Sequence, residues 1–164
     1  MSVAFASFSL SANSAMGGAA ASFAVMDSVK VLKLNTSYLF GYGSDENVSA
    51  LSLGYHQGLY GLFGFQYDIN VGYSFENKQS YLEAHGGVGF LFLFFDIGFK
   101  KTFGVNPGTA IQYGLSTMFY SSYDHYFMQA SFYSQNALAS NALSDGFRVQ
   151  LSYGYKFNNS RSGY

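Results

Sequence analysis

Strict alternation of apolar and polar residues is the feature that most constrains the fold of this 164-residue chain. In GFQYDINVGYSF, residues 64 to 75, every second position is aromatic or branched aliphatic, and the positions between carry Gly, Gln, Asp, Asn or Ser. Successive side chains of an extended strand point to opposite faces. This stretch therefore predicts a strand with one apolar face and one polar face.

The same period recurs eight times between residues 29 and 157. The alternating segments are 29–43, 48–58, 64–75, 80–90, 94–104, 109–120, 126–134 and 146–157. Two kinds of connection alternate along the chain. Polar ones lie at 44–47, 76–79, 105–108 and 134–145, and short ones lie near 59–63, 91–93 and 121–125. Strands of this length that are separated by turn residues favour consecutive antiparallel hairpins. We therefore expect an all-β fold, an antiparallel up-and-down barrel of eight strands.

Side-chain volume decides which face of this barrel points outward. The interior of an eight-stranded barrel is only about wide enough for its own side chains, and Phe, Tyr, Leu and Ile dominate the apolar faces. A soluble barrel would instead need many Lys and Glu outside, yet charged residues make up only 10% of the chain. Strands of about 9 to 11 residues suit a tilted bilayer crossing. We expect a transmembrane barrel with the lipid bilayer around it.

Composition excludes several other classes of protein. The net charge of −1 offers no basic surface for nucleic acid, so we expect no nucleic-acid partner. Without cysteine the chain has neither disulfides nor thiolate metal sites, and its three histidines lack the spacing of a zinc site. We expect no metal and no cofactor. No run of about 18 apolar residues is present to form a transmembrane helix.

Residues 1–28 carry no charge before Asp27 and allow two interpretations. One is an apolar N-terminal arm on the periplasmic side that packs on the barrel or on an envelope protein partner. The other adds two strands within residues 3–26, for ten in all. We favour the arm, because Val3, Phe5 and Phe8 do not share one parity. The start lacks Lys and Arg, so we expect any export signal to have been removed ahead of Met1. Residues 158–164 are interpreted as a polar C-terminal tail.

The polar parity points charged side chains into the lumen, where they must pair. We predict a polar network there, made of Lys33, His56, Asp68, Asn70, Glu83, His85, Asp96, Lys100 and Arg148. Within it, Glu83 lies nearly opposite Lys100 and should form a cross-strand ion pair. Ser52, His85 and Glu83 also contain the parts of a hydrolase triad. We favour the structural network over the triad, because so narrow a lumen would exclude a substrate.

The end of the chain carries a resemblance to a known family. QLSYGYKF, residues 150–157, has the polar start, the alternating apolar positions and the closing aromatics of a terminal barrel strand. With the eight alternating segments, residues 29–157 are similar to the small OmpA/OmpX-type outer-membrane barrels. Ser152 stands where that signal usually has glycine, and seven residues follow Phe157. The resemblance implies Tyr155 and Phe157 as an assembly signal for the outer-membrane assembly machinery, and an integral location in a Gram-negative cell envelope.

Architecture alone does not fix an activity, because this fold serves as adhesin, anchor, pore and enzyme. Three of the four longer connections have only about four residues, which is short for a receptor or adhesin surface. On the lipid face we find Ser49 and Thr117 without a partnered histidine. We therefore expect a protein that is not an enzyme but a membrane scaffold or anchor, as a subunit of a larger envelope assembly. The alternative is a small porin-like pore or a lipid-modifying enzyme.

Overall fold

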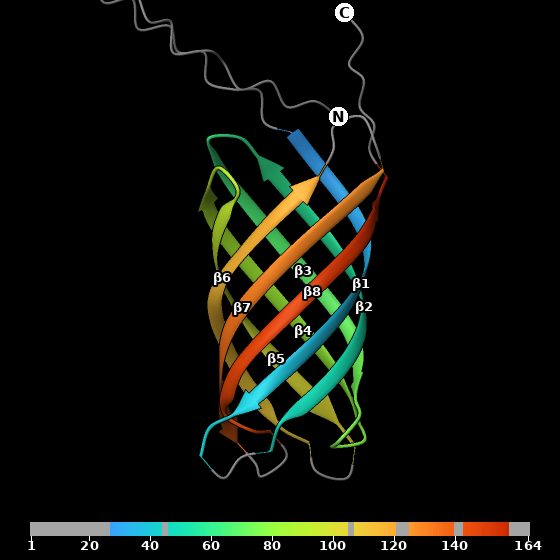
Figure 1. Ribbon diagram of the computed structural model, residues 1–164, viewed down its shortest axis with the longest axis vertical. Coiled ribbons are helices and arrows are strands. Elements are labelled where there is room, and N and C mark those ends of the chain that lie inside the picture. The colour runs from blue at the N-terminus through green and yellow to red at the C-terminus, as the bar shows by residue number, and fades with distance from the viewer. Residues whose placement is uncertain (1–26, 44–45, 105–106, 121–124, 140–142, 158–164) are drawn as a thin grey trace, which may run out of the picture.

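The computed structural model describes residues 27–43, 46–104, 107–120, 125–139 and 143–157. They form a closed barrel in which each strand pairs antiparallel with the next and the last pairs with the first (Figure 1). The strands are β1 (Asp27–Gly41), β2 (Val48–Tyr60), β3 (Phe63–Ser74), β4 (Gln79–Phe90), β5 (Leu93–Phe103), β6 (Thr109–Tyr120), β7 (Tyr126–Ala139) and β8 (Gly146–Lys156). The predicted all-β, eight-stranded, up-and-down antiparallel barrel is confirmed.

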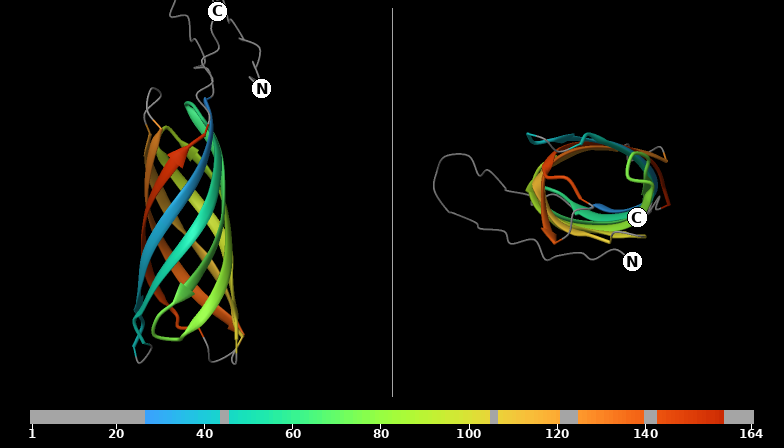
Figure 2. Two further views of the ribbon diagram at one scale, coloured as in Figure 1. Left: turned by 90° about the vertical axis from the view of Figure 1, so that its right-hand side faces the viewer. Right: turned by 90° about the horizontal axis from the view of Figure 1, so that it is seen from below.

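The barrel closes where β1 meets β8, from Val31 opposite Lys156 to Gly41 opposite Gly146. The end-on view in Figure 2 shows the strands as one ring. A closed ring has no free edge at which the two extra strands of the ten-strand alternative could pair, and residues 3–26 lie outside the described residues. The tail 158–164 lies outside them as well. No helix in the described part of the chain is long and apolar enough to cross a membrane.

One predicted boundary is wrong. Residues 134–145 read as a polar connection, but β7 continues to Ala139 and stays paired with β6, with Gln135 opposite Gln112 and Ala137 opposite Ala110. Ser134 and Asn136 stand at two outward positions here, before the exposed Leu138. Alternation of hydrophobicity is lost there while alternation of side-chain direction continues, and Gln135 is 1% exposed.

The two ends of the barrel differ. We call the end with the connections after β1, β3, β5 and β7 the loop end, and the end with the other three connections the turn end. The turn end also holds the start of β1 and the end of β8. In Figure 1 the turn end is at the top and the loop end at the bottom.

The outer face is apolar on all eight strands. On β3, the exposed fractions of Phe65, Ile69 and Val71 are 58%, 47% and 61%, whereas the intervening Asp68 and Asn70 are 2% and 0% exposed. The other strands follow the same rule, with large apolar side chains outward. Among the described residues, the large hydrophobic side chains therefore lie mainly on the surface.

Inward glycines make room for large polar side chains on neighbouring strands. A methyl group at Gly54 would lie 1.8 Å from Oδ1 of Asn70, which is its partner in the ladder. At Gly98 it would lie 2.3 Å from the ring of His85, again the cross-strand partner. In such pairs, a large side chain fills the space that the glycine opposite it leaves free.

Candidate functional site

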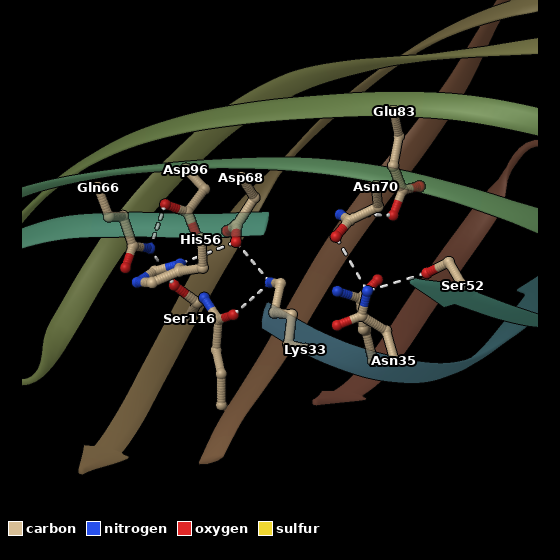
Figure 3. Close-up of polar contacts among 12 residues, drawn as sticks. Lys33, Asn35, Ser52, His56, Gln66, Asp68, Asn70, Glu83, Asp96 and Ser116 are labelled. Atoms are coloured by element: carbon tan, nitrogen blue, oxygen red, sulfur yellow. Dashed lines mark hydrogen bonds and ion pairs between the residues drawn. The ribbon is translucent and has the colours of Figure 1, made fainter. Parts of the chain in front are cut away.

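The structure places all nine residues of the predicted polar network inside the barrel. Each is at most 4% exposed: Lys33, His56, Asp68, Asn70, Glu83, His85, Asp96, Lys100 and Arg148. They come from six of the eight strands and form a central cluster and a loop-end cluster, parts of which Figure 3 shows in one view.

Asp68 is the hub of the central cluster. Its Oδ1 lies 2.5 Å from Nζ of Lys33 and 2.8 Å from Nδ1 of His56, which is directly opposite in the ladder (Figure 3). Lys33 also donates to Gln129 at 2.8 Å, and Nε2 of His56 is hydrogen-bonded to the hydroxyl of Tyr60. The carboxylate is thus paired from two strands, as a buried charge requires.

Asp96 and His85 extend the central cluster through neutral partners. Asp96 accepts hydrogen bonds from Gln66 at 2.7 Å and from the hydroxyl of Tyr133 at 3.3 Å. Nε2 of His85 lies 2.7 Å from Oε1 of Gln112, and the His85 ring stacks on Tyr133 with centroids 4.6 Å apart. These contacts join β3, β4, β5, β6 and β7 across the lumen.

The loop-end cluster is built on Glu83 and Arg148. Both guanidinium ends of Arg148 reach the carboxylate, with Nη2 to Oε1 at 3.1 Å and Nη1 to Oε2, and Nη2 also donates to Ser37 at 3.0 Å. Asn70 donates to Glu83 at 3.1 Å and accepts from Asn35 at 2.9 Å. The cluster is a two-pronged ion pair inside an amide and hydroxyl shell.

The expected ion pair between Glu83 and Lys100 is wrong, although the register that placed them opposite each other is right. Arg148 reaches Glu83 across the lumen from β8, and its planar fork matches a carboxylate better than an ammonium does. Nζ of Lys100 instead lies 3.9 Å from the ring centroid of Tyr81. Reasoning from neighbouring strands does not detect contacts that cross the lumen.

The triad arrangement of Ser52, His85 and Glu83 does not assemble. Ser52 accepts from Asn35 at 2.9 Å, while His85 is engaged by a glutamine and Glu83 by an arginine. A different line, Asp68 to His56 to Tyr60, has the carboxylate, imidazole and hydroxyl order of a nucleophilic triad. The Tyr60 hydroxyl group belongs to a side chain that is 4% exposed, so a substrate cannot meet it.

Apolar side chains fill the lumen at the turn end, and we call them the turn-end plug. Its members are Val29, Val31, Tyr60, Phe94, Met118 and Phe127, with Tyr120 packed against them. The sequence analysis missed the plug, although the parity was readable. Phe94 shares its face with Asp96, and Phe127 shares its face with Gln129, so apolar residues had to enter the lumen at these strand ends.

At the loop end the lumen opens into a hollow, the loop-end vestibule. Its polar lining comes from Ser37, Ser74, Asn77, Lys100, Gln135, Ser144 and Arg148. Arg148, which pairs with Glu83, thus belongs both to this lining and to the loop-end cluster. A solute could enter the lumen here.

Ser49 is the outer-face serine that the sequence singled out, and it is committed to a carboxylate. Its hydroxyl donates to Oε1 of Glu76 at 2.6 Å and its backbone N–H donates to Oε2 at 2.7 Å. These hydrogen bonds hold the pKa of Glu76 below its ordinary value of 4.5, and the hydrogen bond from the Ser49 hydroxyl has the largest effect. A hydroxyl that donates to an acid without an imidazole is not an activated nucleophile.

Tyr155 and Phe157, the predicted assembly signal, lie on the outer face at the turn end. They are 55% and 53% exposed, and their rings are in edge contact at 5.8 Å. The backbone N–H of Phe157 donates to the carbonyl of Lys30 at 2.9 Å, which extends the closing ladder by one bond.

Comparison with protein-family models, curated proteins and solved structures gives no match. Among the described residues, no group of three or more histidine and carboxylate side chains is arranged to hold a metal ion. The function must therefore be argued from the geometry of the barrel itself.

Proposed function

We propose that this chain is an integral β-barrel of a bacterial outer membrane, and that it acts as a non-catalytic scaffold or anchor in a larger envelope assembly. The observation that carries the proposal is the inverted distribution of side chains. Large apolar groups cover the outside, while buried charges and amides occupy the inside.

The outer face supports a lipid environment. Monomeric soluble proteins rarely expose apolar patches above a few hundred Å², yet this barrel exposes large apolar side chains on every strand. Closure also satisfies the strand edges, which a bilayer core demands. Exposed aromatic residues at the strand ends, such as Tyr73 and Phe75 at the loop end and Tyr126 and Phe157 at the turn end, suit the two interfacial girdles.

The lumen supports a scaffold rather than a pore. The turn-end plug fills one end with aromatic and aliphatic side chains. Farther toward the loop end, the central cluster ties Lys33 to Asp68, and the loop-end cluster ties Arg148 to Glu83. An ion on this path would have to displace the plug and break both pairs, so we expect no steady conductance.

The terminal strand supports the family and its location. Its closing aromatics, Tyr155 and Phe157, face outward where assembly machinery could bind them. By analogy with barrels of the OmpA/OmpX type, the short connections of the turn end face the periplasm and the loop end faces outward. Residues 1–28 would then enter β1 from the periplasmic side, where an envelope protein partner could bind them.

Refolding into lipid vesicles, followed by conductance in planar bilayers, tests this proposal. We expect the protein to fold into vesicles, to migrate differently on a gel before and after boiling, and to conduct no steady current. A variant with Phe94→Ala and Phe127→Ala, which opens the plug, controls for the sensitivity of the recording. Stable channels from the parent protein would contradict the scaffold proposal and support a pore. Folding in buffer without lipid or detergent would contradict the membrane proposal.

A further inference from the structure

The loop-end cluster holds one more positive charge than negative charge. Arg148 and Lys100 supply two cations, and Glu83 supplies one carboxylate, which Arg148 occupies with both of its guanidinium ends. In the described part of the chain, no carboxylate lies within ion-pair distance of the Lys100 ammonium. The ammonium lies over the face of Tyr81, 3.9 Å from the ring centroid, and Glu83 attracts it only from beyond ion-pair distance across the ladder.

An ammonium in this position is incompletely compensated. Lys100 is 4% exposed, and a buried charge without a counter-charge is costly. The ring of Tyr81 offers a cation–π contact, which supplies only part of what a carboxylate would. Asp145, another carboxylate at the loop end, already accepts from the backbone N–H of Ala137 at 2.5 Å. An anion bound at the loop end would supply the missing negative charge.

The loop-end vestibule provides a place for that charge. Lys100 and Arg148 both line it, and the hydroxyls of Ser37 and Ser74 and the amide of Gln135 complete a ring of polar groups. Leu143 and Ser144 also line it. The hollow has room for a small group.

We propose that the loop-end vestibule binds one small oxyanion, such as phosphate, with the ammonium of Lys100 as the principal ligand and Arg148 as the second positive group. Hydroxyl donors from the serines would take the remaining oxygens. This inference goes beyond the proposed scaffold function. It depends on the lumen alone and holds whether or not the barrel lies in an outer membrane.

Urea unfolding of the full chain in detergent micelles, at constant ionic strength, tests the site. Inorganic phosphate is compared with a bulky sulfonate buffer. We expect phosphate to stabilise the folded protein. At phosphate concentrations well above the dissociation constant, each tenfold increase in phosphate should raise the folding equilibrium constant about tenfold. Lys100→Met should lose this response. Lys101→Met, which removes the neighbouring lysine on the outer face, should keep it.

Equal responses in all three proteins, or an equal response to the sulfonate, would reduce the effect to general salt stabilisation and overturn the proposal. If Lys100→Met does not fold, amide NMR of the parent protein decides. Saturable phosphate-dependent shifts at Ser37 and Ser74, with Phe127 in the plug unchanged, support the site, and their absence refutes it. A sugar phosphate tests whether the bound phosphate group belongs to a free ion or to a larger molecule. Binding of the sugar phosphate without binding of inorganic phosphate would contradict a small-ion site.

Discussion

Replacing Arg148 with Met should destabilise the barrel strongly, because it removes the partner of a buried carboxylate. Arg148 gives Glu83 two hydrogen bonds from its guanidinium, and after the change only the amide of Asn70, at 3.1 Å, still donates to it. Breaking a buried ion pair from one side costs about 3 to 5 kcal/mol. Lys100 faces the same carboxylate across the ladder, so we expect the lower end of this range, about 3 kcal/mol.

A double-mutant cycle with Glu83→Gln measures the coupling directly. Urea unfolding in lipid vesicles gives the free energy of unfolding for the parent, the two single variants and the double variant. The double variant should cost about 2 kcal/mol less than the sum of the single variants, since it leaves no unpaired charge. Glu76→Gln, at an exposed carboxylate, should change stability far less than either variant and serves as the control.

A coupling near zero would refute this reasoning. It would mean that water screens Glu83 from Arg148, so the lumen would be wet rather than dry. Single variants as stable as the parent protein, together with measurable conductance, would point to a pore.

Three further predictions concern the outer face, the terminal strand and the loop end. Ile69→Arg should cost about 2 to 4 kcal/mol in vesicle refolding if this position meets the bilayer midplane, and full tolerance would contradict lipid contact. Replacing Tyr155 and Phe157 with Ser should reduce insertion in cells, measured by membrane fractionation, more than it reduces refolding in detergent. Equal losses in the two assays would mean that the substitutions affect stability and not recognition. Because its folded pKa is depressed, Glu76 adds stability that is present above about pH 4.5 and lost as the pH falls through that folded pKa. Ser49→Ala should return the pKa of Glu76 toward 4.5 in a carboxyl NMR titration, and no change would mean that the hydroxyl is not its cause.

The sequence predicts the strands well because one physical rule governs nearly all of them. In a closed sheet with apolar residues on the outer face and a packed polar lumen on the inner face, apolar and polar residues must alternate with period two. The prediction fails at 134–139, where the outward positions of Ser134 and Asn136 are polar and only Leu138 keeps the hydrophobic signal. Direction still alternates there, as the burial of Gln135 shows, but hydrophobicity no longer reports it.

The membership of the lumen follows from parity, but its pairing does not. Parity points Glu83, Lys100 and Arg148 inward, and hairpin register places the first two opposite each other. Which cation takes the carboxylate depends on reach across the barrel and on guanidinium geometry, and these are three-dimensional properties. The turn-end plug was overlooked for a simpler reason, since an apolar residue such as Phe94 at an inward position looks like an outward one displaced by a single place.

The central claim is that lipid surrounds the apolar face, and a tryptophan introduced on that face tests it most directly. The chain has no Trp, so Ile69→Trp would carry the only indole signal. In vesicles, its emission should be blue-shifted and strongly quenched by lipids brominated at mid-chain. Tyr73→Trp, nearer the loop end, should be quenched better by lipids brominated near the headgroup. Emission at the wavelength of water-exposed indole, without quenching by either lipid at either position, would contradict the membrane assignment.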